Sequence, residues 1–113
     1  MANPSYRAAS SAGEVINGAV AAAFRVPLAE LRAVTRRHAH TALARQTAMY
    51  LAHVEFGLNF SEIGRAFGRD RTTAAHACRR IEDRRTEPQL DAALASLAHA
   101  LRRDLAAARG AGA

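Results

Sequence analysis

Apolar residues recur every three to four positions along most of the chain, with polar or charged residues between them. This spacing is typical of amphipathic helices, because residues three or four apart lie on one face of a helix. No segment is a convincing strand. The pattern therefore predicts an all-α fold, a compact bundle of five to six helices that contains a helix-turn-helix.

The spacing places six helical segments along the chain. They are expected at about residues 14–24, 28–32, 42–56, 60–67, 71–85 and 89–109. The positions that should face the core include Val15, Ile16, Val20, Leu43, Thr47, Tyr50, Leu51, Val54, Ile63, Ala74, Ala77, Cys78 and Ile81. Residues 1–12 have the composition of a flexible leader and 108–113 that of a flexible tail, so one domain is expected over 13–107.

Side chains that can cap a helix stand at the start of three of these segments, the first two being those over 42–56 and 60–67. Ser, Thr, Asp and Asn accept hydrogen bonds from the free N–H groups of the first helical turn. Thr41 is the predicted cap of the helix over 42–56, and either Asn59 or Ser61 is the predicted cap of the next one. In that short helix, Gly64 should permit the close approach of a neighbouring backbone.

The stretch from Gly68 to Thr73 has the features of the turn in a helix-turn-helix. Gly68 can end one helix and Asp70 can cap the next. A helical wheel gives the helix after Asp70 a cationic polar side, made up of Arg71, Thr72, Thr73, His76, Arg79 and Arg80. A basic helix entered through a tight turn suits insertion into the major groove of DNA. A solvated face is the alternative, and it is preferred for Arg84 and Arg85.

The charge balance also favours nucleic acid as the partner. The chain has 113 residues and a formal net charge of +6. It contains 16 arginines and no lysine. Nucleic acid is the leading polyanionic partner for such a chain, although a GC-rich genome would also favour arginine. Arg36 and Arg37 form a second basic patch that could enter a minor groove beside the helix; from spacing alone, a solvated loop is the more favoured interpretation.

Candidate chemistry other than DNA binding is scarce. The chain has no phosphate-loop, dinucleotide-binding, nucleophile-elbow or zinc-protease motif, so we expect no enzyme activity, no nucleotide and no cofactor. His76 and Cys78 lie about 200° apart on one helix, so a metal site is not expected. Cys78 is predicted to be a small core residue and His99 a surface residue. With no membrane-spanning segment or signal peptide, a cytoplasmic location is expected.

A row of leucines marks the last helix: Leu90, Leu94, Leu97, Leu101 and Leu105. This is ordinary core spacing for a terminal helix packed on its own domain. It could also form a dimer seam, the less favoured use because the row covers only about two heptads. A homodimer is thus compatible with the sequence but not indicated by it.

Three runs of residues resemble a known family. They are A-R-Q-T-A-M-Y-L-A at 44–52, S-E-I-G-R-A-F-G at 61–68, and R-D-R-T-T-A-A-H-A-C-R-R-I at 69–81. Together they resemble the C-terminal DNA-binding domain of the bacterial replication initiator DnaA, from about residue 13 to about residue 105. The resemblance implies a helix-turn-helix domain that binds double-stranded DNA.

The resemblance also implies roles for individual residues. The segment after Asp70 would enter the major groove and the Arg36-Arg37 loop the minor groove, while Arg45 and Gln46 would contact the DNA backbone. His53 stands where the family often has a Lys that faces phosphate. The DNA-binding residues expected overall are Arg36, Arg37, Arg45, Gln46, His53, Ser61, Arg69, Asp70, Arg71, Thr72, Thr73, His76 and Arg79.

The chain departs from the family's pattern at three points. Arg71 replaces a base-contacting His, and an arginine can contact guanine O6 and N7 instead. Gly68 stands alone where family members commonly have two glycines. The ATPase module that precedes this domain in the initiator is missing from the chain, so we expect no ATP binding of that kind.

These observations predict a sequence-specific double-stranded DNA-binding protein, a regulator of transcription or of replication initiation. The alternative is a protein-interaction module that retains the fold, binds DNA weakly and non-specifically, and docks on a partner through the helix over Leu90–Leu105.

Overall fold

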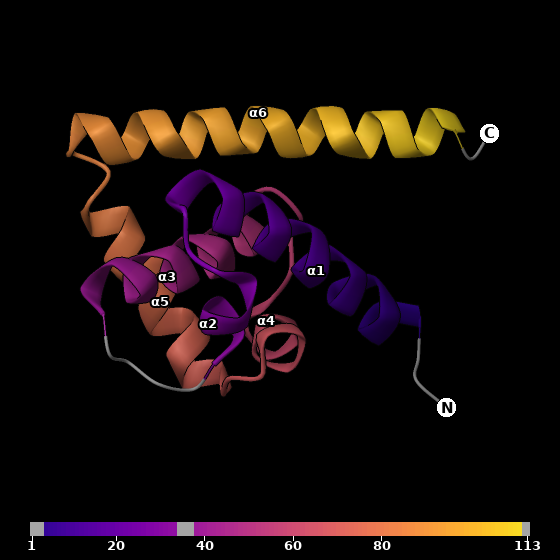
Figure 1. Ribbon diagram of the computed structural model, residues 1–113. Coiled ribbons are helices and arrows are strands. Elements are labelled where there is room, and N and C mark those ends of the chain that lie inside the picture. The colour runs from indigo at the N-terminus through magenta and orange to yellow at the C-terminus, as the bar shows by residue number, and fades with distance from the viewer. Residues whose placement is uncertain (1–3, 34–37, 112–113) are drawn as a thin grey trace.

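A computed structural model describes the backbone of residues 4–33 and 38–111, and the side chains of 11–33, 38–104 and 106–107. The described chain forms helices and no strand, as predicted (Figure 1). The helices are α1 (Pro4–Phe24), α2 (Leu28–Arg32), α3 (Ala39–Val54), α4 (Phe60–Phe67), α5 (Arg71–Asp83) and α6 (Pro88–Ala111).

Helix α3 is the centre of the bundle and contacts each of the other five helices. Its inner faces carry small residues: Ala44, Ala48 and Ala52 are fully buried, so neighbouring helices can approach closely. Larger side chains from the surrounding helices fill the rest of the core, among them Ile63 and Ile81 at 0% exposure. The alanine-rich composition is thus used where helices cross.

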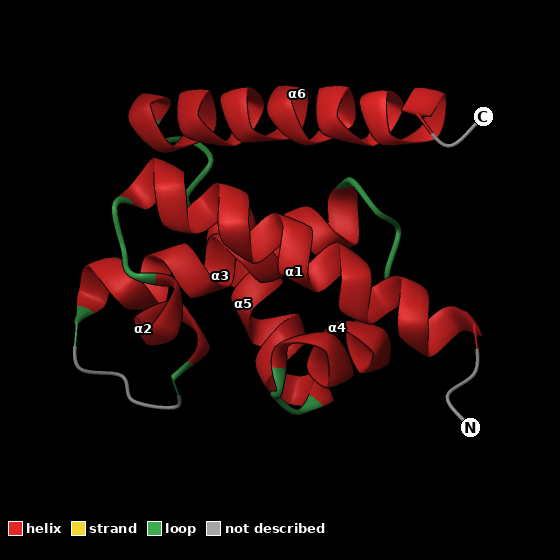
Figure 2. Cartoon of the chain, turned by 45° about the vertical axis from the view of Figure 1, so that its right-hand side comes forward, coloured by secondary structure: helices red, strands yellow, loops and turns green. Residues whose placement is uncertain are grey.

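Helix α6 lies along one side of the molecule, beside α1, in both ribbon views (Figures 1 and 2). Leu90, Leu94, Leu97 and Leu101 are buried, which confirms the core interpretation for these four residues. The side chain of Leu105 lies outside the described part. Because the four leucines are already covered within the chain, they offer no free apolar surface for a partner.

Two ion pairs join α6 to the rest of the chain, one near its start and one further along. Arg85 Nε lies 3.0 Å from Asp91 Oδ1, near the start of α6. Further along, Arg102 donates through Nε and Nη2 to both carboxylate oxygens of Glu55, each at 2.8 Å, just after the end of α3. Arg102 is exposed, so we attribute orientation rather than much stability to this pair.

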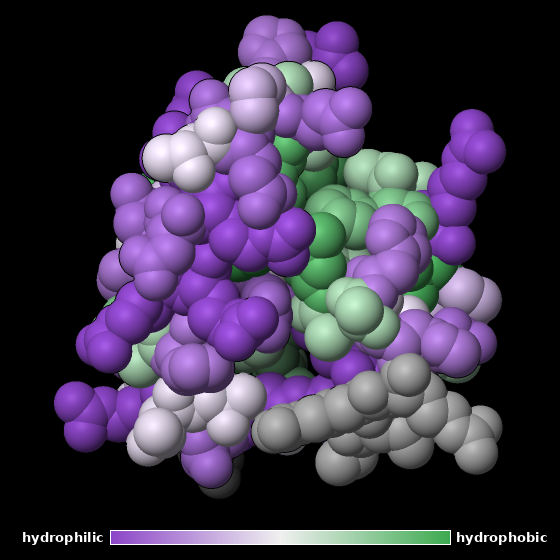
Figure 3. Space-filling model, turned by 90° about the vertical axis from the view of Figure 1, so that its left-hand side faces the viewer, coloured by the Kyte–Doolittle hydropathy of each residue, from purple (hydrophilic) through white to green (hydrophobic). Residues whose placement is uncertain are grey.

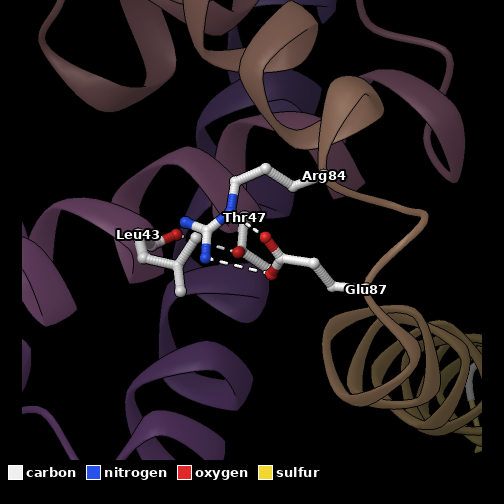
Figure 4. A network of polar contacts seen from close by, with 4 residues as sticks. All are labelled: Leu43, Thr47, Arg84 and Glu87. Atoms are coloured by element: carbon white, nitrogen blue, oxygen red, sulfur yellow. Dashed lines mark hydrogen bonds and ion pairs between the residues drawn. The ribbon is translucent and has the colours of Figure 1, made fainter.

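A hydrogen-bonded cluster joins α3 to the end of α5. The Tyr50 hydroxyl donates to Glu82 Oε2 at 2.6 Å, and Arg85 Nη1 donates to the Tyr50 oxygen at 3.1 Å. Burial, followed by the hydrogen bond to Glu82, raises the pKa of Tyr50. Arg84 forms a two-pronged pair with Glu87, and the Thr47 hydroxyl donates to the Leu43 carbonyl (Figure 4). Arg84 and Arg85 are therefore neutralised by Glu87 and Asp91.

Several predictions made from spacing are wrong in detail. The helix predicted over 42–56 begins at Ala39 after His38, which makes no side-chain cap, and Thr41 is buried in its first turn instead of capping it. His40 Nε2 lies 2.6 Å from the Phe24 carbonyl and so ties this earlier start to the end of α1. Val54, the last residue of α3, is 47% exposed, and Val15 is 43% exposed.

The two chain ends also differ from the expected outline. Helix α1 begins at Pro4, inside the predicted leader, and α6 extends to Ala111, inside the predicted tail. A proline suits the first position of a helix because its missing N–H is not needed there. The domain boundaries at 13 and 107 stay predictions.

Candidate nucleic-acid interface

The helix-turn-helix consists of α4, the turn at Gly68 to Asp70, and α5. Asn59 caps α4 in a capping box: its Oδ1 accepts from the Glu62 N–H at 2.8 Å, while Glu62 Oε1 accepts from the Asn59 N–H at 2.9 Å. This decides between the two predicted caps in favour of Asn59, because only it has a Glu three residues further on. Ser61 lies exposed in the first turn.

The turn has the conformation expected from its sequence. Gly68 ends α4 with φ 67° and ψ 34°, the left-handed region that glycine adopts without a steric penalty. Asp70 then caps α5, since its Oδ1 accepts from the Thr73 N–H at 2.7 Å. That hydrogen bond lowers the pKa of Asp70 below its ordinary value, so the cap is charged at neutral pH.

Gly64 sets the distance between α4 and the turn. A Cβ atom at this position would lie 2.6 Å from the Arg69 carbonyl oxygen, closer than any real side chain comes. The Gly64 carbonyl also accepts from the Arg69 N–H at 2.8 Å. The predicted close approach is therefore confirmed, and it is made by the turn itself.

Helix α5 has the two faces that the helical wheel predicts. Ala74, Ala77, Cys78 and Ile81 are buried. On the other side Arg71, Thr72, His76, Arg79 and Arg80 are exposed, and Thr73 is half-buried. Figure 3, which looks onto the side that is at the left in Figure 1, shows hydrophilic residues gathered over one half of this face and apolar residues on the other.

The arginines of α5 and its neighbours fall into two groups. Arg84, Arg85 and Arg102 each pair with a carboxylate. By contrast, Arg71, Arg79, Arg80 and His76 form no hydrogen bond or ion pair within the described part of the chain. The unpaired cations lie along the exposed side of α5, which begins after the capping carboxylate of Asp70 and ends with Glu82 and Asp83.

A groove of about 620 Å³ separates the start of α3 from α5. It brings together several of the predicted residues, namely Arg45, Gln46, Arg69, Asp70, Thr72, Thr73 and His76. Arg80 also lines it, although it was not among the predicted contacts. Its position seven residues after Thr73, on the shoulder of the wheel, is the signal that could have identified it. The predicted residues Arg71, Arg79, His53 and Ser61 do not line this groove.

Two of the predicted arginines are turned toward α2. Arg45 is 9% exposed and donates to the Leu31 carbonyl at 3.0 Å and to the Glu30 carbonyl at 2.7 Å. Arg69 donates to the Ala33 carbonyl at 2.7 Å. A cation at the C-terminal end of a helix satisfies carbonyls that have no intrahelical partner. Both side chains thus hold the end of α2, directly before residues 34–37.

His53 lies apart from the groove, near the end of α3. Its Nδ1 is 2.8 Å from the Leu58 carbonyl, and its ring lies 4.8 Å from that of Phe60. Because a carbonyl can only accept, Nδ1 must carry hydrogen, and Nε2 is the ring atom left for another partner. Arg36 and Arg37 lie outside the described residues, so their predicted contacts stay predictions.

Other candidate chemistry has a structural explanation. Cys78 is buried, its Sγ lies 3.8 Å from the Met49 carbonyl, and burial raises the pKa of its thiol to about 11. His99 is exposed, as predicted. No three His, Cys, Asp or Glu side chains gather to hold a metal ion in the part of the chain that the structure describes. None of the described helices is long and apolar enough to cross a membrane.

Comparison with known proteins agrees with this arrangement. Residues 14–81 match the family described as the bacterial dnaA protein helix-turn-helix. A chromosomal replication initiator protein DnaA from Thermomicrobium roseum is 46% identical over 81 residues, which are 70% of this chain and 17% of that protein. A DnaA 1 from Protochlamydia amoebophila is 42% identical over 61% of this chain and 15% of its own length. For DnaA from Acinetobacter baylyi the identity is 42%, over 72% and 17%.

Proposed function

Because the chain belongs to the family of bacterial DnaA helix-turn-helix domains, we propose that it is a sequence-specific double-stranded DNA-binding protein. It would act as a regulator of transcription or of replication initiation. The full-length relatives are named as replication initiators, and the chain spans about a sixth of their length. Their other activities are therefore not carried over to it.

The observation that supports this proposal best is the set of unpaired cations on α5. Three nearby arginines, Arg84, Arg85 and Arg102, each pair with a carboxylate. Arg71, Arg79 and Arg80 are instead exposed along α5, beside His76, and form no ion pair within the described residues. Phosphate oxygens and base edges would supply the acceptors that these donors lack.

We assign the start of α5 to the major groove. Arg71 would contact a guanine through O6 and N7, and Thr72, Thr73 and His76 would contact adjacent bases or their methyl groups. Gln46 lies on the opposite side of the protein's own groove, on α3, and would contact the DNA backbone. Arg79, Arg80, His53 and Ser61 would supply further backbone contacts, and the Arg36-Arg37 segment would enter the minor groove.

Arg45 and Arg69 are given a different part in this proposal. Their hydrogen bonds to the carbonyls of Glu30, Leu31 and Ala33 fix the end of α2, from which the Arg36-Arg37 segment departs. They would therefore orient the minor-groove contact relative to α5. Losing either should weaken binding to all sequences.

The proposal is tested by fluorescence anisotropy with duplexes selected from a random pool. Binding should weaken steeply with salt, because each neutralised phosphate releases a counterion. Arg79→Gln should reduce the salt slope by about one, whereas Arg103→Gln, an equal change of charge at an exposed site on α6, should not. Absence of salt-dependent binding to any duplex, including genomic DNA, would refute the proposal.

The alternative, a protein-interaction module that docks through α6, has less support. Four of the leucines that would form its docking surface, Leu90, Leu94, Leu97 and Leu101, are buried against the chain's own core. A partner that survives nuclease treatment in a pull-down, together with weak binding of equal strength to all duplexes, would favour it.

A further inference from the structure

A second cavity adjoins the groove between α3 and α5, and residues of α1, α2, α3 and α4 line it. Its volume is about 270 Å³. The charged and amide side chains that line it are Glu14, Asn17, Arg32, Arg45, Arg65 and Arg69. Arg45, Met49 and Arg69 also line the groove beside α5, so these three residues lie between the two spaces.

Asn17 is the unusual member of this lining. It is only 8% exposed, yet its side-chain amide forms no hydrogen bond within the described part of the chain. Among the described residues, no fully buried side-chain nitrogen or oxygen lacks a partner. The Asn17 amide must therefore reach the open space of the cavity. The amide is thus available to hydrogen-bond with a polar group inside the cavity.

The charge of the lining indicates what that group is. Four arginines and one glutamate give the cavity a formal charge of +3. Arg45 and Arg69 already donate to α2 carbonyls, but Arg32 and Arg65 are exposed and form no hydrogen bond or ion pair within the described residues. Their guanidinium groups present donors in a planar fork that matches phosphate oxygens.

We infer that this cavity binds a small phosphate-bearing anion. Arg32 and Arg65 would donate hydrogen bonds to its phosphate oxygens, and the Asn17 amide nitrogen would donate to a further oxygen. The positive charges of Arg45 and Arg69 would attract the anion. The volume is enough for several waters, or for one phosphate group with a small substituent. The phosphate could belong to a free small molecule or to the backbone of a bound duplex.

Nuclear magnetic resonance can test this with the full 113-residue chain and inorganic phosphate as the probe. Phosphate would be titrated at constant ionic strength, with chloride as the balancing anion. We expect saturable shifts at the Asn17 side-chain amide and at the Nε of Arg32 and Arg65. Arg65→Gln and Arg32→Gln should each raise the phosphate Kd about tenfold, as should Asn17→Leu if it folds. Arg103→Gln should change it less than twofold.

A second titration, in the presence of a saturating duplex, identifies the source of the phosphate. If the DNA backbone fills the cavity, the response to phosphate should vanish; if the ligand is a free anion, the response should persist. Shifts that grow linearly without saturation, or an equal Kd for Arg65→Gln and Arg103→Gln, would overturn the inference and leave Asn17 solvated by water. Because the first titration needs no DNA, its failure would not affect the proposed function.

Discussion

Replacing Gly64 by alanine should disturb the turn that sets the position of α5. The added Cβ would lie 2.6 Å from the Arg69 carbonyl oxygen, 3.2 Å from the Asp70 carbonyl carbon and 3.3 Å from the Arg71 nitrogen. All three are backbone atoms, which cannot rotate away as the end of a side chain can. Either α4 or the start of α5 must therefore shift.

The size of this effect follows from two opposing contributions. Alanine is favoured over glycine inside a helix by about 1 kcal/mol. Overpacking against a fixed neighbour costs about 1–3 kcal/mol, and contact with backbone places this site at the upper end. The net loss should be about 1–2 kcal/mol, which lowers the melting temperature by roughly 4–8 °C for each kcal/mol. Thermal and urea unfolding followed by circular dichroism would measure it.

Gly18 provides a matched control within α1. A Cβ at this position would meet nothing within 4 Å, so Gly18→Ala should stabilise the protein by up to about 1 kcal/mol. Gly64→Ala should also weaken binding to duplex DNA at temperatures at which it is fully folded, while Gly18→Ala should not. If both substitutions stabilise the chain equally, the account of the turn is wrong.

Three further predictions test single contacts. Tyr50→Phe should lower the free energy of unfolding by about 1–2 kcal/mol, because the Glu82 carboxylate loses its hydroxyl donor; an unchanged urea midpoint would contradict that contact. The Thr73 N–H lowers the pKa of Asp70 below the ordinary 3.8, so the stability from this cap is present above that value and is lost as pH falls through the lowered pKa. Unfolding curves of wild type and Asp70→Ala should therefore converge in acid, and a constant difference at every pH would exclude this linkage. His53→Lys should tighten binding to every duplex and steepen the salt slope by about one; no change in slope would place His53 away from phosphate.

The amphipathic face of α5 could be predicted from the sequence because its signals are local. Asp70 and Gly68 define the start of the helix, and the 100° rotation per residue then fixes which side chains face inward. The four positions predicted to be buried are buried in the structure. Local geometry was enough here, since the helix has a strong cap and small inner residues.

The partners of Arg45 and Arg69 could not be predicted in this way. Arg45 bonds to carbonyls 14 and 15 residues earlier in the chain, and Arg69 bonds to one 36 residues earlier. The spacing of apolar and polar residues does not predict such long-range hydrogen bonds, because they depend on how α2 packs against α3 and the turn. The family resemblance indicated DNA for Arg45, which stays a prediction, and the structure adds its hydrogen bonds to the end of α2.

The start of α3 illustrates a second limit. Thr41 has a side chain that can cap a helix, but the helix begins earlier, where His40 reaches the end of α1. A propensity for a cap is weaker than a tertiary contact that orders the preceding residues. At the other end, Val54 follows the apolar spacing but lies at the last residue of the helix, where it remains exposed.

The central claim is that Arg71, at the start of α5, contacts a base. The most direct test compares wild type with Arg71→Ala on the selected duplex and on every single-base variant of it, using Arg103→Ala as the control. Arg71→Ala should cost about 1–3 kcal/mol on the best site and abolish discrimination at one base pair, with the other positions unchanged. An equal loss on all sequences, or no loss at all, would contradict the claim.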